Sequence, residues 1–307
     1  MTPRPPAGHP APSHPPLQAS GPAAAHDPSL GRHPPARGPR RWFPGRPELA
    51  LYLARFRTLV QYRAAAAAGF ATQLFWGVIR LAILAAFIDG APATSPMTPS
   101  AIIAYVWLSQ ACFAMLPWNL DPEILALVRS GNVAGELVRP LGLYRQWFCR
   151  CLAARTAPPL LRGIPLLAIA WTAGDLPLPA GPATAAAWLA ALAGAALLCA
   201  TFATLMNVCL LYTLSGDGIN GLMAAVVTLG SGLILPLPFL PDGWQRVLEI
   251  LPFRGMVDAP FRLYGGDLPL TALGGILAHQ AAWILVLGTA GWWLCRTAER
   301  RMTVQGG

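Results

Sequence analysis

The chain contains no lysine and few charged residues of any kind. Charged residues make up 11% of its 307 residues, whereas 55% are hydrophobic. An ordinary soluble domain carries roughly a quarter charged residues, and a water-soluble protein of this size needs that ionic surface to stay dispersed. The composition therefore excludes a soluble globular protein and favours an integral membrane protein.

Several sequence motifs of known chemistry are also missing. No GxxxxGK[ST] motif occurs, so the chain is not expected to bind ATP through a phosphate-binding loop. Neither an HExxH nor a GxSxG motif is present, and no paired carboxylates lie near the apolar segments. The six cysteines form no CxxC pair and have no histidine at metal-binding spacing. We therefore predict no catalytic residues, no metal and no cofactor, and interpret the cysteines as buried thiols.

The net charge of +9 comes entirely from an excess of arginine. A basic balance can indicate nucleic-acid binding. Here the arginines flank long apolar runs, so orientation in a membrane explains them better. No nucleic-acid partner is expected. Most arginines lie on the inner side if the N-terminus is cytoplasmic, which predicts that both termini are cytoplasmic.

The first 46 residues differ from the rest of the chain. They contain three proline pairs and four of the five histidines, together with many alanines and glycines. Proline at this density removes backbone donors and prevents a packed core. Residues 1–46 are therefore predicted to be a disordered tail, and residues 47–307 to be one membrane domain.

An amphipathic helix is predicted over residues 47–63. Pro47 suits the first position of a helix, and Glu48 suits the positive end of the helix dipole. An apolar face is formed by Leu49, Leu53, Phe56 and Val60, with polar surface around it from Arg55, Arg57, Gln61 and Arg63. Such a helix lies at the membrane boundary.

Six apolar segments then predict an all-α polytopic membrane protein. A helix needs about 20 apolar residues to cross a bilayer. The predicted spans are 64–88, 101–118, 152–173, 183–212, 219–240 and 270–295. The second is short, and the third is weakened by Arg155, Arg162 and the Pro158-Pro159 pair. The main alternative is a count of four spans, which leaves out the weaker second and third segments.

Two connections are more than simple linkers. In the cytoplasmic stretch 121–150, Asp121 suits a helix N-cap, Gly131 suits a helix end, and a second short helix is expected from Val133 to Val138. These helices form either a docking platform for a cytosolic partner or an ordinary interfacial loop. The external segment 241–266 has an apolar stripe followed by Pro252, which predicts two short helices dipping into the outer leaflet.

Short strings in the apolar region carry a family resemblance. They follow one another over most of the chain from Pro47 onward. The strings are Gln61-Tyr62-Arg63, Phe75-Trp76-Gly77 with Arg80, Tyr105-Val106-Trp107-Leu108 with Gln110, Arg129-Ser130-Gly131-Asn132-Val133, Glu136-Leu137-Val138-Arg139-Pro140 and the terminal Val304-Gln305-Gly306-Gly307. In this order they resemble the permease subunits of type-2 ABC exporters, the ABC-2 family.

The resemblance implies a six-span permease that works with other chains. The expected partners are a second permease, identical or related, and two cytosolic ABC ATPase subunits, which supply ATP hydrolysis that this chain lacks. The region 121–150 and the turn at Asp217 match the places of the family's cytoplasmic coupling helices, and the external helices match its re-entrant element. The expected ATPase-coupling residues are Val128, Arg129, Gly131, Glu136, Leu137, Arg139 and Asp217.

Other function classes remain as alternatives. A secondary transporter driven by an ion gradient needs carboxylates within the membrane, and the predicted spans contain none. A membrane-embedded enzyme needs clustered nucleophiles or ligands, and a structural anchor needs neither. The substrate-binding residues are not identifiable, although an amphipathic or hydrophobic solute suits the apolar spans. Alanine-rich, lysine-free composition favours a bacterial plasma membrane.

Overall fold

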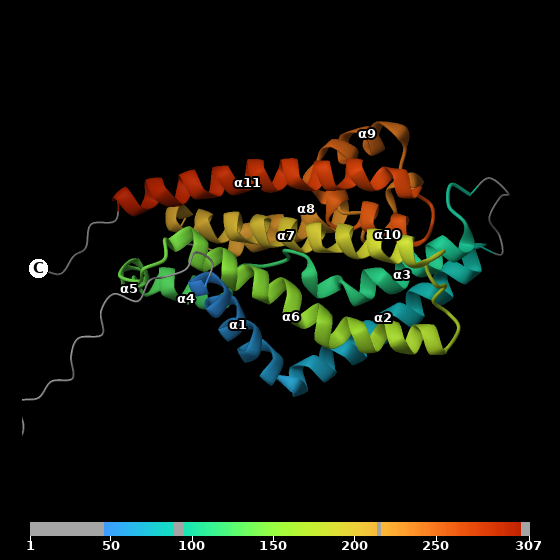
Figure 1. The fold of residues 1–307 in the computed structure, drawn as a ribbon, viewed down its shortest axis with the longest axis horizontal. Helices are drawn as coiled ribbons and strands as arrows, with labels where there is room; N and C mark the ends of the chain where they lie inside the picture. The colour runs from blue at the N-terminus through green and yellow to red at the C-terminus, as the bar shows by residue number, and fades with distance from the viewer. Residues whose placement is uncertain (1–45, 89–94, 214–215, 302–307) are drawn as a thin grey trace, which may run out of the picture. The chain divides into compact units, whose positions relative to one another are not determined.

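The computed structural model describes residues 46–88, 95–213 and 216–301, which contain helices and connections but no strands (Figure 1). The predicted tail up to Gly45 and the terminal residues 302–307 lie outside this description. The elements are α1 (Arg46–Gln61), α2 (Arg63–Ile88), α3 (Pro99–Ala111), η2 (Phe113–Met115), α4 (Pro122–Arg129), α5 (Ala134–Leu137), α6 (Leu143–Thr172), α7 (Pro182–Thr213), α8 (Asp217–Gly230), η3 (Leu237–Phe239), α9 (Asp242–Ile250), η4 (Pro252–Gly255), α10 (Asp258–Tyr264), η5 (Leu270–Ala272) and α11 (Leu273–Arg301).

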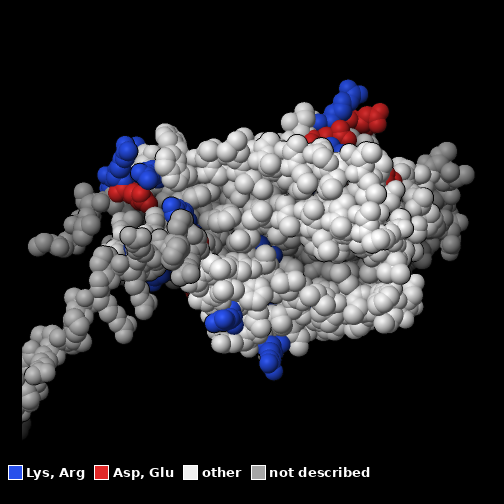
Figure 2. All heavy atoms as spheres, in the orientation of Figure 1, with Lys and Arg blue, Asp and Glu red and all other residues white. Residues whose placement is uncertain are grey.

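Three stretches of the described residues are long and apolar enough to cross a membrane. They are Arg63–Ile83, Pro182–Thr213 and Leu270–Arg301, which correspond to the first, fourth and sixth predicted spans. On the face drawn in Figure 2, charged side chains gather near the C-terminal end of α11 and at α9, a few basic side chains lie near the middle and along the lower edge, and most of the remaining surface is uncharged. The chain is thus compatible with a membrane protein, as its composition predicts.

The other three predicted spans differ from simple crossing helices. The predicted span 101–118 ends as a helix at Ala111, so α3 has 13 residues and is about 20 Å long. The predicted span 219–240 likewise ends at Gly230 and leaves α8 with 14 residues, shorter than the ~30 Å hydrocarbon core. Helix α6 starts at Leu143, earlier than the predicted residue 152, and includes three internal prolines. Hydropathy underestimates α6 because its first turns contain arginines.

Helix α7 forms the centre of the bundle. It packs against α6 on one side and α11 on another, and also contacts α10, as the parallel course of α11, α7 and α6 in Figure 1 shows. Small residues line its contacts, and Ala191, Ala195 and Ala203 are completely buried. Small side chains let neighbouring backbones approach closely, which is how helices associate in membranes.

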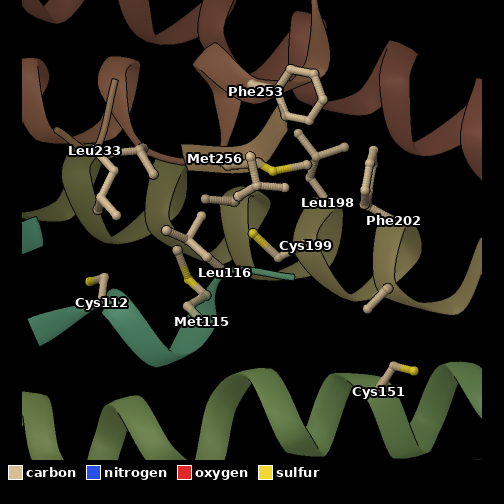
Figure 3. Packing of buried hydrophobic residues seen from close by; sticks show 14 of the residues in the cluster. Cys112, Met115, Leu116, Cys151, Leu198, Cys199, Phe202, Leu233, Phe253 and Met256 are labelled. Atoms are coloured by element: carbon tan, nitrogen blue, oxygen red, sulfur yellow. The ribbon is translucent and has the colours of Figure 1, made fainter. Parts of the chain in front are cut away.

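The main core lies where α7 meets the segment after α3 and the helices before α11. Figure 3 shows Met115 and Leu116 on one side of Leu198 and Cys199, with Met256 and Phe253 on the other. All are buried within this cluster. The core therefore joins parts of the chain that are far apart in sequence, and the extended segment after η2 is part of it.

The extended segment between η2 and α4 is held by side chains instead of helical hydrogen bonds. Arg155 of α6 donates from Nη1 to the Leu116 carbonyl oxygen at 2.7 Å and from Nη2 to the Asn119 carbonyl oxygen at 2.9 Å. Asn220 Oδ1 accepts from the Leu120 amide at 2.9 Å, and Asn207 Oδ1 accepts from the Asp121 amide at 3.1 Å. Irregular backbone is tolerated within a membrane only where the protein satisfies its polar groups in this way.

The helices predicted at the external segment occur, but they differ from each other in environment. Helix α9 exposes Trp244 and Ile250, at 65% and 71%. Helix α10 instead lies inside the bundle against α7 and α3, and its Asp258 is completely buried. The Asp258 Oδ1 atom accepts hydrogen bonds from the Leu237 amide at 3.1 Å and from the Tyr105 hydroxyl at 3.5 Å.

Candidate functional site

The segment 121–142, which contains α4 and α5, is here called the platform. It lies at the end of the bundle where α11 finishes, opposite α9 and α10 (Figure 1). Asp121 caps α4 as the sequence predicts, and its carboxylate accepts from the amides of Glu123 and Ile124. Gly131 follows α4 with a φ of 73°, a left-handed conformation that glycine adopts without strain. The predicted end of the first short helix is therefore confirmed.

The underside of the platform is apolar and buried. Ile124 is fully buried, and Val128 and Val133 are 7% and 5% exposed. Helix α4 contacts α7 through this face. Leu125 lies close to Gly216 at the start of α8, where an added Cβ would come within 3.2 Å of its side chain. The platform thus packs directly against α7 and the start of α8.

Helix α5 is too short to be stable alone, and a buried ion pair fixes it. The Glu136 carboxylate is 2.8 Å from Arg150 Nη2 and 3.5 Å from Arg139 Nη1. Glu136 and Arg139 pair as their three-residue spacing predicts, although Arg139 lies beyond the end of α5. The buried Gln146 adds hydrogen bonds from Nε2 to the carbonyl oxygens of Glu136, at 2.9 Å, and Leu141, at 2.6 Å. The four-residue helix is therefore tied to the first turns of α6.

Helix α1 also binds the platform, through ion pairs between Arg55 and the first residues of the platform. Arg55 is 3.3 Å from Asp121 and also pairs with Glu123. Burial by itself lowers the pKa of Arg55, but these two carboxylates outweigh it and raise the pKa overall. Glu48 pairs with Arg145 of α6 at 2.8 Å, and the Tyr52 hydroxyl is 3.0 Å from Thr156 Oγ1. Helix α1 thereby links the platform to α6.

The apolar face predicted for α1 is only partly covered by the protein, since Phe56 and Val60 are half-buried. Leu49 and Leu53 are exposed, at 55% and 37%, whereas the polar contacts above join α1 to α6. Arg55, predicted as polar surface, has a side chain only 13% exposed. The helix therefore presents leucines outward, as an interfacial helix does toward lipid, and uses charged residues to hold the protein.

The predicted coupling residues divide into an exposed set and a buried set. Arg129, Gly131 and Arg139 are exposed, and Leu137 is half-buried. Arg129 lies 3.8 Å from Asp217, which brings the two predicted coupling segments together. Val128 and Glu136 are buried, so they do not offer a contact surface, and Glu136 instead anchors α5. Exposed Val138, at 86%, lies beside Arg139.

Sequence reasoning missed the residues that position the platform. Arg150, Asn207 and Asn220 make contacts described above and were not singled out, and Arg55 was assigned only to polar surface. Asn207 and Asn220 carry a usable signal, because a lone amide in an apolar run is usually hydrogen-bonded to another segment. Their partners lie about a hundred residues away, and no local pattern identifies them.

No protein-family model matches this chain, and no curated protein matches it. The resemblance to ABC-2 permeases therefore stays a prediction.

The Glu136–Arg150 pair gives a stability prediction. Glu136→Gln keeps the side-chain volume but leaves Arg150 facing a neutral amide in a buried site. We expect a loss of about 1.5 kcal/mol of unfolding free energy, the lower value for a hydrogen bond to a charged group. The measurement is titration of the purified protein with sodium dodecyl sulfate. Arg129→Ala removes an exposed pair and should change stability by less than about 1 kcal/mol; equal losses in both variants would contradict the proposed anchoring.

Proposed function

We propose that this chain is the transmembrane permease subunit of an ATP-driven ABC exporter of the type-2 branch. In this proposal it pairs with a second permease and with two cytosolic ABC ATPase subunits. The observation that carries the proposal is the platform. Two short helices, exposed on their outer side and held by buried polar contacts on their inner side, have the construction expected of a coupling surface.

The contacts of the platform support transmission of force. A displacement of α5 acts on α6 through Glu136 and Arg150. A displacement of Asp121, at the start of α4, acts on α7 through Asn207, and on α1 through Arg55. Hydrogen-bond and salt-bridge networks between rigid elements can carry energetic coupling between sites. ATP-driven closure of the ATPase subunits would thus reach the bundle without a flexible linker.

A six-span arrangement with an external re-entrant element completes the proposal. Helix α3 is mostly buried by neighbours, so its short length does not need to match the lipid, and the extended segment continues the crossing. Arg150 and Arg155 of α6 are bonded inside the protein, which offsets the cost of charge in a membrane. Helix α8 and the connection to η3 form the fifth crossing. We place the chain in a bacterial plasma membrane with both termini in the cytoplasm.

Recovery of the ATPase tests the proposal. Pull-down of the full chain from mildly solubilised native membranes should recover a protein with a phosphate-binding loop and ATPase activity. The variant Arg129→Glu with Val138→Asp changes only exposed platform side chains and should reduce this recovery at least about tenfold, because it reverses a charge and charges an apolar contact. Arg246→Glu, at the opposite end of the bundle, is the matched control.

Three results bear on the two parts of this proposal. Absence of any ATPase from the wild-type pull-down would overturn the permease assignment. Equal recovery by the platform variant and the Arg246→Glu control would overturn the docking surface alone. An unchanged unfolding midpoint in both variants excludes a folding defect as the cause of lost recovery.

One observation favours transport driven by an ion gradient as a second candidate. The predicted spans lack carboxylates, but α10 places Asp258 inside the bundle, and buried carboxylates in membranes often belong to ion pathways. Asp258 lies 3.5 Å from Arg262 and accepts the two hydrogen bonds described above, an arrangement that equally suits a structural anchor. Solute movement by proteoliposomes of this chain alone under a proton gradient, abolished by Asp258→Asn, would favour this candidate over the permease.

A further inference from the structure

A pocket with a polar wall lies between α2 and α3, inside the region proposed to cross the membrane. Its volume is about 270 Å³, and it is lined by Thr72, Gln73, Trp76, Arg80, Gln110 and Phe113. Residues 72, 73, 76 and 80 recur at helical spacing on one face of α2. The polar side chains among them therefore face one space over about 12 Å of helix, at a rise of 1.5 Å per residue.

Arg80 brings a positive charge to this pocket without a carboxylate partner. Among the described residues no ion pair includes Arg80, and its guanidinium donates one hydrogen bond, from Nη1 to the Leu233 carbonyl oxygen at 3.2 Å. An arginine has five N–H donors. A cation inside a membrane span is costly unless it is paired, so an anion entering the pocket would be favoured.

Two buried amides adjoin the same space. Gln73 and Gln110 are 5% and 3% exposed, and Gln73 Oε1 is buried without a hydrogen-bond partner among the described residues. A buried acceptor that lacks a donor lowers stability. A ligand with a hydroxyl group near its anion would supply that donor, and the anion would bind Arg80.

The rim of the pocket is aromatic and accessible. Trp76 and Phe113 are 52% and 38% exposed, so the pocket opens at the surface of the chain beside apolar rings. Gly77 allows α2 and α3 to approach here, since an added Cβ would lie 2.9 Å from the Trp107 ring. A polar interior with an apolar rim matches an amphipathic molecule whose head enters and whose chain stays outside.

We propose that this pocket binds the anionic, hydroxyl-bearing head of an amphipathic solute, with Arg80 holding the anion and Gln73 and Gln110 holding its hydroxyl groups. The inference rests on the proposed function, because it identifies the substrate class of the permease. The cavity accommodates a head group rather than a whole amphiphile, since sites for complete drug-sized ligands measure about 300–1,000 Å³.

Native mass spectrometry of the full chain tests this pocket without any partner. Phosphatidylglycerol, whose phosphate bears a glycerol head, is titrated onto the delipidated protein, with phosphatidylcholine as the lipid lacking a head-group hydroxyl. We expect Arg80→Gln and Gln73→Leu each to weaken phosphatidylglycerol binding at least about tenfold, in line with loss of a charge-assisted or buried hydrogen bond. Arg162→Gln, which removes an arginine of α6 that does not line the pocket, should bind like the wild type.

Further measurements distinguish a lipid head group from a soluble anion as the ligand. They also distinguish failure of the pocket proposal from failure of the permease proposal. Competition by inorganic phosphate that depends on Arg80 would keep the pocket and assign it to a soluble anion instead of a lipid head. Binding of phosphatidylglycerol that is equal in the wild type, Arg80→Gln and Gln73→Leu would overturn the pocket. Because this assay needs no ATPase and the pull-down needs no ligand, failure of one proposal leaves a distinct result for the other.

Discussion

Replacing Arg155 by methionine should destabilise the protein by about 2–4 kcal/mol and release the platform from the bundle. The buried guanidinium satisfies the Leu116 and Asn119 carbonyl oxygens, and each hydrogen bond to a charged group contributes about 1.5–3 kcal/mol. Methionine fills similar space but donates nothing, so both carbonyl groups lose their donor. Removal of a buried charge relieves its desolvation cost, which offsets part of the loss and gives the stated range.

Denaturation in sodium dodecyl sulfate measures this effect, and amide hydrogen exchange locates it. Faster exchange should appear in the extended segment 116–121 and in α4 before it appears in α7. Arg162→Met is the matched control, because Arg162 lies on the same helix and makes no hydrogen bond described above. If Arg162→Met lost as much stability as Arg155→Met, the carbonyl contacts of Arg155 would not be the cause.

Gly163→Ala should also destabilise the protein, by up to about 2 kcal/mol, although alanine favours helices. A Cβ at this position would lie 2.6 Å from the backbone oxygen of Ala111, so α3 and α6 would have to separate. Overpacking of this kind costs typically about 1–3 kcal/mol. The helix preference of alanine over glycine, about 1 kcal/mol, offsets only part of that cost.

Gly288→Ala provides a control of opposite sign. There the nearest atoms to an added Cβ are Thr201 Cγ2 and the Tyr144 hydroxyl, both at 3.7 Å, an ordinary contact distance. We expect Gly288→Ala to gain up to about 1 kcal/mol in the same denaturation assay. A gain in stability by Gly163→Ala as well would show that α3 and α6 do not pack at the observed separation.

The helix ends of the candidate site were predictable from the sequence, but the contacts that hold its helices to the bundle were not. Asp121 and Gly131 predict the start and end of α4, because capping depends on neighbouring residues only. The burial of Glu136 was not predictable, since its partner Arg150 lies on another helix and a charged residue is usually exposed. A contact surface and an anchor look alike in sequence, because both consist of charged residues in a short amphipathic segment.

The sequence by itself determined that this is an all-helical chain suited to a membrane, since composition and the length of apolar runs act locally and add along the chain. It also determined the three strongest spans and the two short helices of the platform. Only the tertiary structure decided where helices end inside apolar runs. The predicted span 101–118 stops at Ala111 because Arg155, Asn207 and Asn220, all distant in sequence, satisfy the extended backbone that follows. Hydrogen-bond partners that folding brings together can satisfy non-helical backbone within an apolar run. A hydropathy scale describes single residues and does not include such long-range partners.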